Sequence, residues 1–202
     1  MKHPSCRELY RYWDRLRSGL PAPRRTAIEP SDIRTILADT FILEVGERRS
    51  YRFRLAGTRL CGILGRELKG SEFLDLWSGE DRAQVAGLLG AVTGEAAAAS
   101  LGVSAAARSD RHLAMEMVLL PLIQNGPGYD RILGALAPGE LPYWLGLDPV
   151  SDLSVGSTRL IWPDRDDPFP IALTPQPHIV SAFAPERRRG RFVVVEGGKS
   201  GL

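Results

Sequence analysis

The sequence predicts an α+β fold: a five-stranded antiparallel sheet with helices on one face, an amphipathic helix at the N-terminus and a proline-rich tail at the C-terminus. Along residues 51–56, apolar side chains alternate with arginine or alanine, which is the pattern of a half-buried strand. A Gly57-Thr58 break follows, and apolar residues then recur at helical spacing over 59–64. The expected order of two strands, a helical crossing and three more strands suits one antiparallel sheet.

The first predicted element is an amphipathic helix over residues 5–18. Ser5 and Glu8 form a capping-box pattern at its start, and Gly19 and Pro21 end it. Its apolar residues recur at the spacing that places them on one face of a helix. They are Leu9, Tyr12, Trp13 and Leu16. This stripe has to dock, so we expect it to cover the domain that follows or a second copy of the chain.

The remaining elements follow from the same periodicities. We expect helices over 30–38, 59–64 and 80–92, and strands over 41–45, 51–56, 97–107, 112–122 and 131–137. Residues 1–23 then form the N-terminal helix with its connection, 24–140 the domain, and 141–202 an extended tail. Eight of the 15 prolines lie in this tail, and that density excludes long helices and central strands. We expect only strand-like pieces there, at 157–162 and 191–195, with a mobile stretch around 163–177.

The composition excludes several classes of protein. The chain has 26 basic and 24 acidic residues, a balance that argues against a dedicated nucleic-acid binder. No apolar run reaches the roughly 18 residues of a membrane span, and arginines interrupt the N-terminus, unlike a secretory signal. We therefore expect a cytoplasmic protein without a membrane span. Its two cysteines, Cys6 and Cys61, are expected to be free thiols.

An ordered set of motifs resembles a PAS domain and is similar to the bacterial family of small stand-alone PAS proteins. The resemblance covers about residues 24–140 and is carried by 25–30 (RTAIEP), 32–34, 51–58, 64–68 with Gly70, 73–77, 120–122 and 131–134. It implies a sensory or scaffolding module that binds a small molecule between its sheet and helices, or binds a protein. It also implies dimerisation, or capture of a signalling partner, through the helix that precedes the first strand. The stripe of Leu9, Tyr12, Trp13 and Leu16 is the predicted interface.

Ten residues of the domain are candidates to line a ligand pocket, with Thr58 and Arg59 as its polar groups. They are Phe53, Leu55, Thr58, Arg59, Cys61, Leu64, Phe73, Trp77, Met115 and Met117. The simpler interpretation is that the apolar members form the core, and both hold if a cavity remains among them. The identity of any cofactor stays unknown. The helix expected at 80–92 lacks the histidine of haem-binding relatives, and Cys61 lacks the neighbours that hold a flavin.

Two hypotheses of function follow. The first is a non-enzymatic sensory or scaffold protein of bacterial signalling, because no nucleophile motif or spaced pair of carboxylates is present. The three histidines and two cysteines are too far apart in the sequence to predict a metal site. The alternative is a binding protein or enzyme of another cone-like α+β class that uses a buried acid. Glu116 is the candidate: facing a cavity would favour this alternative, and facing solvent or the N-terminal helix would weaken it.

Overall fold

The computed structural model describes residues 1–109, 111–126 and 128–164. The strand-like piece expected at 191–195 and all but the start of the stretch 163–177 lie outside the described residues. Among the described residues, none of the helices combines the length and apolar character that a membrane crossing requires.

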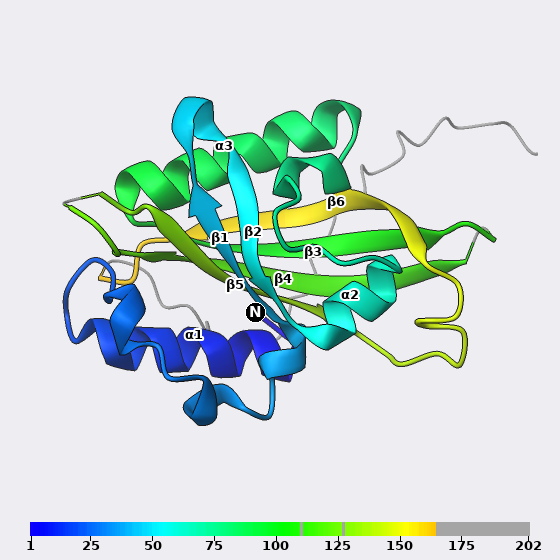
Figure 1. Ribbon diagram of the computed structural model, residues 1–202, viewed down its shortest axis with the longest axis horizontal. Helices are drawn as coiled ribbons and strands as arrows, with labels where there is room; N and C mark the ends of the chain where they lie inside the picture. Colours follow the sequence, from blue (N-terminus) through cyan, green and yellow to red (C-terminus); the bar gives the residue numbers. More distant parts are fainter. Residues whose placement is uncertain (110, 127, 165–202) are drawn as a thin grey trace, which may run out of the picture. The chain divides into compact units, whose positions relative to one another are not determined.

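A single sheet of six strands, antiparallel throughout, organises the described chain (Figure 1). Its strands are β1 (Thr40–Val45), β2 (Tyr51–Ala56), β3 (Ala98–Ala107), β4 (His112–Leu122), β5 (Arg131–Pro138) and β6 (Val150–Ile161). They lie in the order β2-β1-β5-β4-β3-β6. The α-helices are α1 (Pro4–Arg17), α2 (Thr58–Leu64) and α3 (Gly79–Glu95). The predicted α+β class and antiparallel sheet are confirmed.

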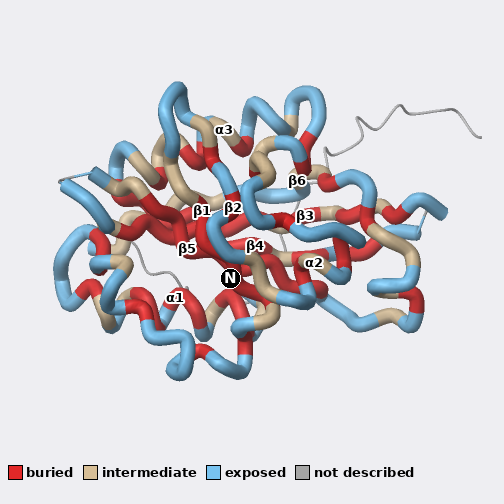
Figure 2. Tube along the Cα trace, viewed as in Figure 1, coloured by how far each residue is buried: buried red, intermediate tan, exposed pale blue. Residues whose placement is uncertain are grey.

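Helices cover both faces of this sheet. Along β4, Met117 and Leu119 belong to a core under α2 and α3, whereas Val118 and Leu120 belong to a second core under α1. We call these two sides the α3 face and the α1 face. Figure 2 shows the buried residues concentrated along the sheet between them. The expectation of helices on a single face therefore holds for α2 and α3 but not for α1, because strands that are apolar on both sides need cover on both sides.

The sixth strand comes from the region that the sequence assigns to the tail. β6 pairs with β3 along ten positions, from Ala98 opposite Ile161 to Ala107 opposite Val150. The register shifts twice along this pair. Such bulges interrupt the regular alternation of inward and outward side chains by which a strand is recognised in the sequence. The part predicted as a strand-like piece at 157–162 is thus the second half of a longer edge strand.

Two local predictions at the N-terminus are wrong. The helix α1 begins at Pro4, with His3 as its N-cap, so Ser5 lies inside the helix and cannot form the capping box. Ser5 Oγ instead donates a hydrogen bond to Asp39, and Glu8 accepts one from Thr35. The expected helix over 30–38 is replaced by two short 3₁₀ turns, Pro30–Ile33 and Leu37–Asp39, because the backbone at Ile36 is not helical.

A close contact between β1 and β5 explains one glycine of the sheet. Gly134 lies opposite Phe41, and a Cβ placed on Gly134 would overlap the Phe41 ring. That ring cannot move aside easily, since it packs against Phe53 and Phe73 with centroid distances of 5.6 Å. Only glycine fits opposite this aromatic cluster.

We expect Gly134→Ala to lower the free energy of unfolding by about 1–3 kcal/mol, the usual cost of overpacking a core. Urea denaturation followed by circular dichroism measures this change. Gly87→Ala is the matched control, because a Cβ at this exposed position of α3 meets nothing within 4 Å. It should raise stability by roughly 0.5–1 kcal/mol. Equal changes in stability for the two substitutions would contradict the conclusion that only glycine fits opposite Phe41.

Candidate functional site

A β-bulge in β2 changes which residues face the interior. Phe53 pairs with Leu43, but Leu55 pairs with Ile42, so Arg54 is the extra residue. The insertion turns Leu55 away from Phe53 and onto the α1 face, where its side chain is 52% exposed. The prediction that Leu55 lines the same pocket as Phe53 is therefore wrong. The simple alternation of residues 51–56 does not hold beyond Phe53.

Beside this bulge lies a cavity of about 520 Å³, which we call the bulge cavity. Its floor is the α1 face of β1, β2 and β5, represented by Ile42, Leu55 and Leu133. Its opposite wall is the linker between α1 and β1, residues 24–39, which contributes Ile28, Ile33 and Leu37. The volume falls within the range of about 300–1,000 Å³ that is typical of small-molecule sites.

Both ends of the linker are fixed to the sheet and its neighbours. At the first end, Arg25 N donates to Ile123 O at 2.7 Å, just beyond β4. At the second end, Gly57 N donates to Thr40 O at 2.8 Å, and a Cβ on Gly57 would overlap the backbone of Ala38. The linker is thus held as a bridge over the cavity.

A second cavity of about 360 Å³ adjoins the first, and we call it the basic cavity. It shares Arg25, Ile42 and Leu55 with the bulge cavity, and it adds Arg54, Lys69 and Arg131 among others. Together the two cavities extend from the linker to the outer edge of β2.

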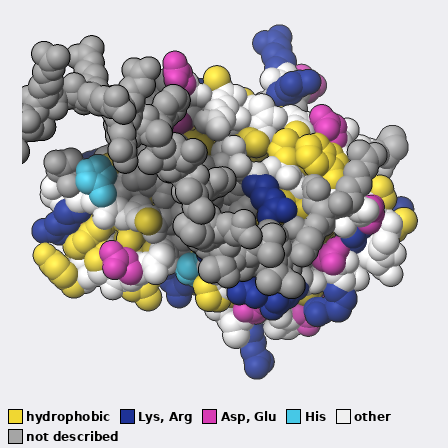
Figure 3. All heavy atoms as spheres, turned by 180° about the vertical axis from the view of Figure 1, so that it is seen from behind, with side chains coloured by type: hydrophobic (Ala, Val, Ile, Leu, Met, Phe, Trp, Pro, Cys, Tyr) yellow, Lys and Arg dark blue, Asp and Glu magenta, His cyan; other side chains and the backbone are white. Residues whose placement is uncertain are grey.

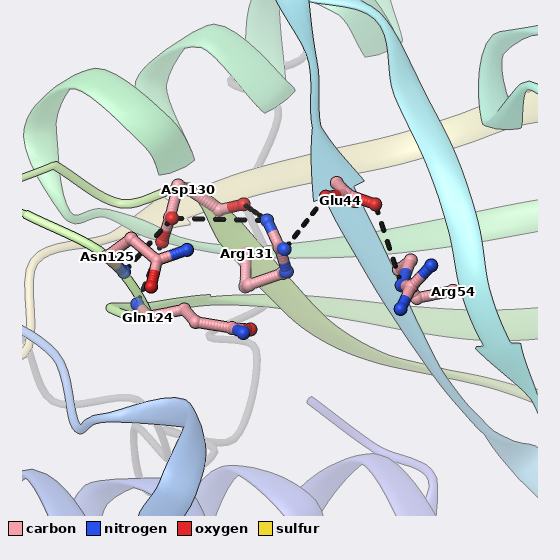
Figure 4. Close-up of polar contacts among 6 residues, drawn as sticks. All are labelled: Glu44, Arg54, Gln124, Asn125, Asp130 and Arg131. Carbon is pink, nitrogen blue, oxygen red and sulfur yellow. Dashed lines mark hydrogen bonds and ion pairs between the residues drawn. The ribbon is translucent and has the colours of Figure 1, made fainter.

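Arg54 and Arg131 are held by one carboxylate on β1 (Figure 4). Glu44 accepts from Arg131 Nη2 at 2.8 Å and lies 3.5 Å from Arg54 Nε. Arg131 also donates to the backbone oxygen of Asp130, and the Asp130 carboxylate accepts from the backbone N–H groups of Gln124 and Asn125. This network fixes the position of two cationic side chains at one end of the basic cavity.

Most of the predicted pocket residues are core residues of the α3 face. Six are buried there and pack with α2, α3 and the 3₁₀ turn Phe73–Leu76. They are Phe53, Leu64, Phe73, Trp77, Met115 and Met117. Tyr51 Oη and Trp77 Nε1 are buried polar atoms of this core, and neither has a hydrogen-bond partner among the described residues. The structure thus brings these six residues together. Their packing fits the simpler interpretation, in which they form the core.

The three other candidates lie on α2, with Thr58 and Arg59 as its first two residues. Thr58 is exposed and lines the bulge cavity. Arg59 forms an ion pair at 2.6 Å with Asp39, which is buried and also accepts a hydrogen bond from Ser5 of α1. Cys61 is partly buried and packs against the core of the α3 face.

Both cysteines are free. Cys6 is buried in α1, and its Sγ donates to the backbone oxygen of Glu116 at 3.4 Å. Burial, helped by the nearby carboxylates of Glu116 and Asp39, raises the pKa of the Cys6 thiol far above its ordinary value. Cys6 is therefore a structural thiol and not a nucleophile.

The predicted interface on the N-terminal helix is mostly inside the chain. Leu9, Tyr12 and Trp13 are buried in the core of the α1 face, and only Leu16 is partly exposed. Trp13 Nε1 donates to Pro121 O of β4 at 2.8 Å. Of the two alternatives left open for the stripe, covering the domain that follows is the one observed, so these side chains cannot form a surface for a second molecule while α1 is docked.

Glu116 faces the N-terminal helix. Its carboxylate accepts two hydrogen bonds of 2.9 Å from the backbone N–H of Lys2 and a further one from that of His3. The N-terminal amino group lies 3.8 Å away. Glu116 also borders an open cavity of about 590 Å³, but its oxygens are occupied by these donors at the start of α1. The observed orientation weakens the alternative in which Glu116 acts as a catalytic acid.

The antiparallel sheet, the short helix α2 after the second strand and the long helix α3 across the sheet define a domain of the α+β class. The comparison with known families identifies it further: residues 1–137 match the family described as PAS domain. The chain therefore belongs to the PAS domain family, whose members have sensory and signalling roles. No curated protein shows significant similarity to the chain.

The sequence did not single out the linker residues that wall the bulge cavity. The motif at 25–30 contributed only to the family resemblance, although Arg25 and Ile28 line the cavity. The residues that line this site come from neighbouring strands and from the linker. They therefore form no motif within a single stretch of the sequence.

Because Trp13 is a core residue, we expect its substitution to affect stability before it affects association. Trp13→Phe keeps an aromatic ring but leaves Pro121 O without its donor, at a cost of about 1–2 kcal/mol. Trp13→Ala should cost about 3–5 kcal/mol. Urea denaturation gives these values, and light scattering gives the mass. A change of mass with unchanged stability would restore the stripe as an interface.

Proposed function

We propose that this protein is a non-enzymatic PAS-type sensory or scaffold protein of bacterial signalling that acts in the cytoplasm. In this proposal a small ligand occupies the bulge cavity, and its presence is relayed to a protein partner through the linker and α1. The observation that carries the proposal is the bulge cavity itself, whose floor belongs to the sheet and whose wall belongs to the linker.

A ligand in this position would contact two structural units at once. It would therefore favour the arrangement in which the linker lies over the sheet, and a ligand shifts an equilibrium only through such a difference in affinity. The linker follows α1 through residues 18–23, so the position of the N-terminal helix depends on the same arrangement. This connection offers a route from ligand binding to a change at the surface.

The partner, or a second copy of the chain, is proposed to bind the outer side of α1. The apolar stripe is buried, and the outer side of α1 carries the exposed polar side chains of Glu8, Arg11 and Arg15. A contact of this kind is compatible with the docked helix. An interface through the stripe would require α1 to leave the sheet.

Two observations support the absence of enzymatic activity. The carboxylate of Glu116 is occupied by backbone donors, and the buried thiol of Cys6 is held in its protonated form. Neither of these groups is available for acid–base or nucleophilic chemistry in the arrangement described.

Native mass spectrometry of freshly purified protein tests the proposal. We expect a bound small molecule on the wild-type chain and its loss from Leu55→Trp, because tryptophan at this half-exposed position fills the bulge cavity. Leu147→Trp is the matched control, since Leu147 is 80% exposed on a loop outside that cavity. This control should retain the ligand.

Two results would contradict the proposal. One is a wild-type chain that carries no ligand and whose melting temperature is not raised by any compound of a metabolite library. The other is a ligand that is released chemically altered after incubation with the protein, which would show enzymatic activity.

A further inference from the structure

Among the described residues, the charged side chains that line the two cavities on the α1 face are all basic. Five basic side chains line them: Arg25 and Arg34 at the bulge cavity, and Arg25, Arg54, Lys69 and Arg131 at the basic cavity. In the part of the chain that the structure describes, neither lining includes an aspartate or a glutamate. A recess bordered in this way attracts anions and disfavours cations.

Part of this charge has no acidic partner within residues 1–109, 111–126 and 128–164. Glu44 neutralises Arg54 and Arg131 in part, as described above. Arg25, Arg34 and Lys69 form no ion pair with any residue in the part of the chain that the structure describes. Arg25 is half-buried at the junction of the two cavities. Its guanidinium is therefore available to a ligand from either side.

The floor between these cations is apolar. Ile28, Ile33, Ile42, Leu55 and Leu133 line the bulge cavity, and the side chains of Leu55 and Leu37 are 52% and 42% exposed. Apolar surface that is left open in a recess gains free energy when an alkyl chain covers it. The site thus combines an apolar trough with guanidinium groups at its border.

We infer that the bulge cavity binds an anionic amphiphile, a molecule with an alkyl chain and a carboxylate head group. The chain lies on the floor formed by Ile42, Leu55 and Leu133, and the carboxylate lies at the border next to Arg25 and Arg34. Guanidinium groups suit a carboxylate because they can donate two parallel hydrogen bonds to its oxygens. This inference rests on the proposed function and adds the chemical class of its ligand.

Three probes whose alkyl chains differ by at most one carbon separate the contribution of the head group from that of the chain. Isothermal titration calorimetry compares decanoate, decanol and decyltrimethylammonium, each below its micelle concentration. We expect decanoate to bind about tenfold more tightly than decanol, as charge-assisted hydrogen bonds to the head group predict. Decyltrimethylammonium should bind more weakly than decanol, and added salt should reduce the preference for decanoate.

Two variants locate the binding. The double variant Arg25→Gln with Arg34→Gln should lower the affinity for decanoate about tenfold and leave that for decanol unchanged. Its matched control is Arg66→Gln with Arg108→Gln, which removes the same charge from exposed positions outside both cavities. Leu55→Trp should abolish the binding of decanoate and decanol alike. Circular dichroism verifies that each variant is folded.

The outcomes separate this inference from the proposed function. Equal affinities for decanoate and decanol, both lost in Leu55→Trp, would overturn the anionic head group and leave the cavity as a ligand site. Binding of decanoate that persists in Leu55→Trp would overturn the location. If neither probe binds while the purified protein retains another ligand, the amphiphile is wrong and the proposed function stands.

Discussion

The burial of the two central strands on both sides is the constraint on which the rest of the structure depends. All eight residues of β5 are buried, and β4 is buried along its whole second half. A sheet with such a centre is stable only when both faces are covered. The α3 face is covered by α2 and α3, and the α1 face needs the N-terminal helix and its linker. The N-terminal segment is thus part of the folded domain.

Incomplete cover at the edge of the α1 face produces the candidate site. α1 packs on β4 and β5, and the linker crosses from there towards β1 and β2 without filling the space beneath it. The bulge in β2 adds Leu55 to this open area, while the small Ala56 takes the position opposite Phe41. Figure 3, the view from behind, shows hydrophobic side chains exposed in patches among lysines and arginines elsewhere on the surface. The recess beside the bulge is a cavity, and its floor is apolar.

Periodicity predicted the main elements well, because each element buries apolar residues that recur at a regular spacing. The strands β2, β4 and β5 and the helices α1, α2 and α3 appear within a few residues of their expected bounds. The side of the sheet on which Leu55 lies could not be predicted, because a bulge at Arg54 leaves no mark in an alternating sequence. The length of β6 was underestimated for a similar reason, because its register against β3 shifts twice. The site itself arises between segments distant in sequence, and only the tertiary structure brings Arg25 beside Leu55.

The carboxylate of Asp39 connects the helices α1 and α2, which cover opposite faces of the sheet. It is almost fully buried, and it holds Ser5 of α1 through one oxygen and Arg59 of α2 through the other. Withdrawal of α1 would take the Ser5 hydroxyl from a buried anion and leave Arg59 as its sole charged neighbour among the described residues. Docking of α1 and docking of α2 are therefore coupled through Asp39, and reciprocity requires that each favours the other by the same free energy.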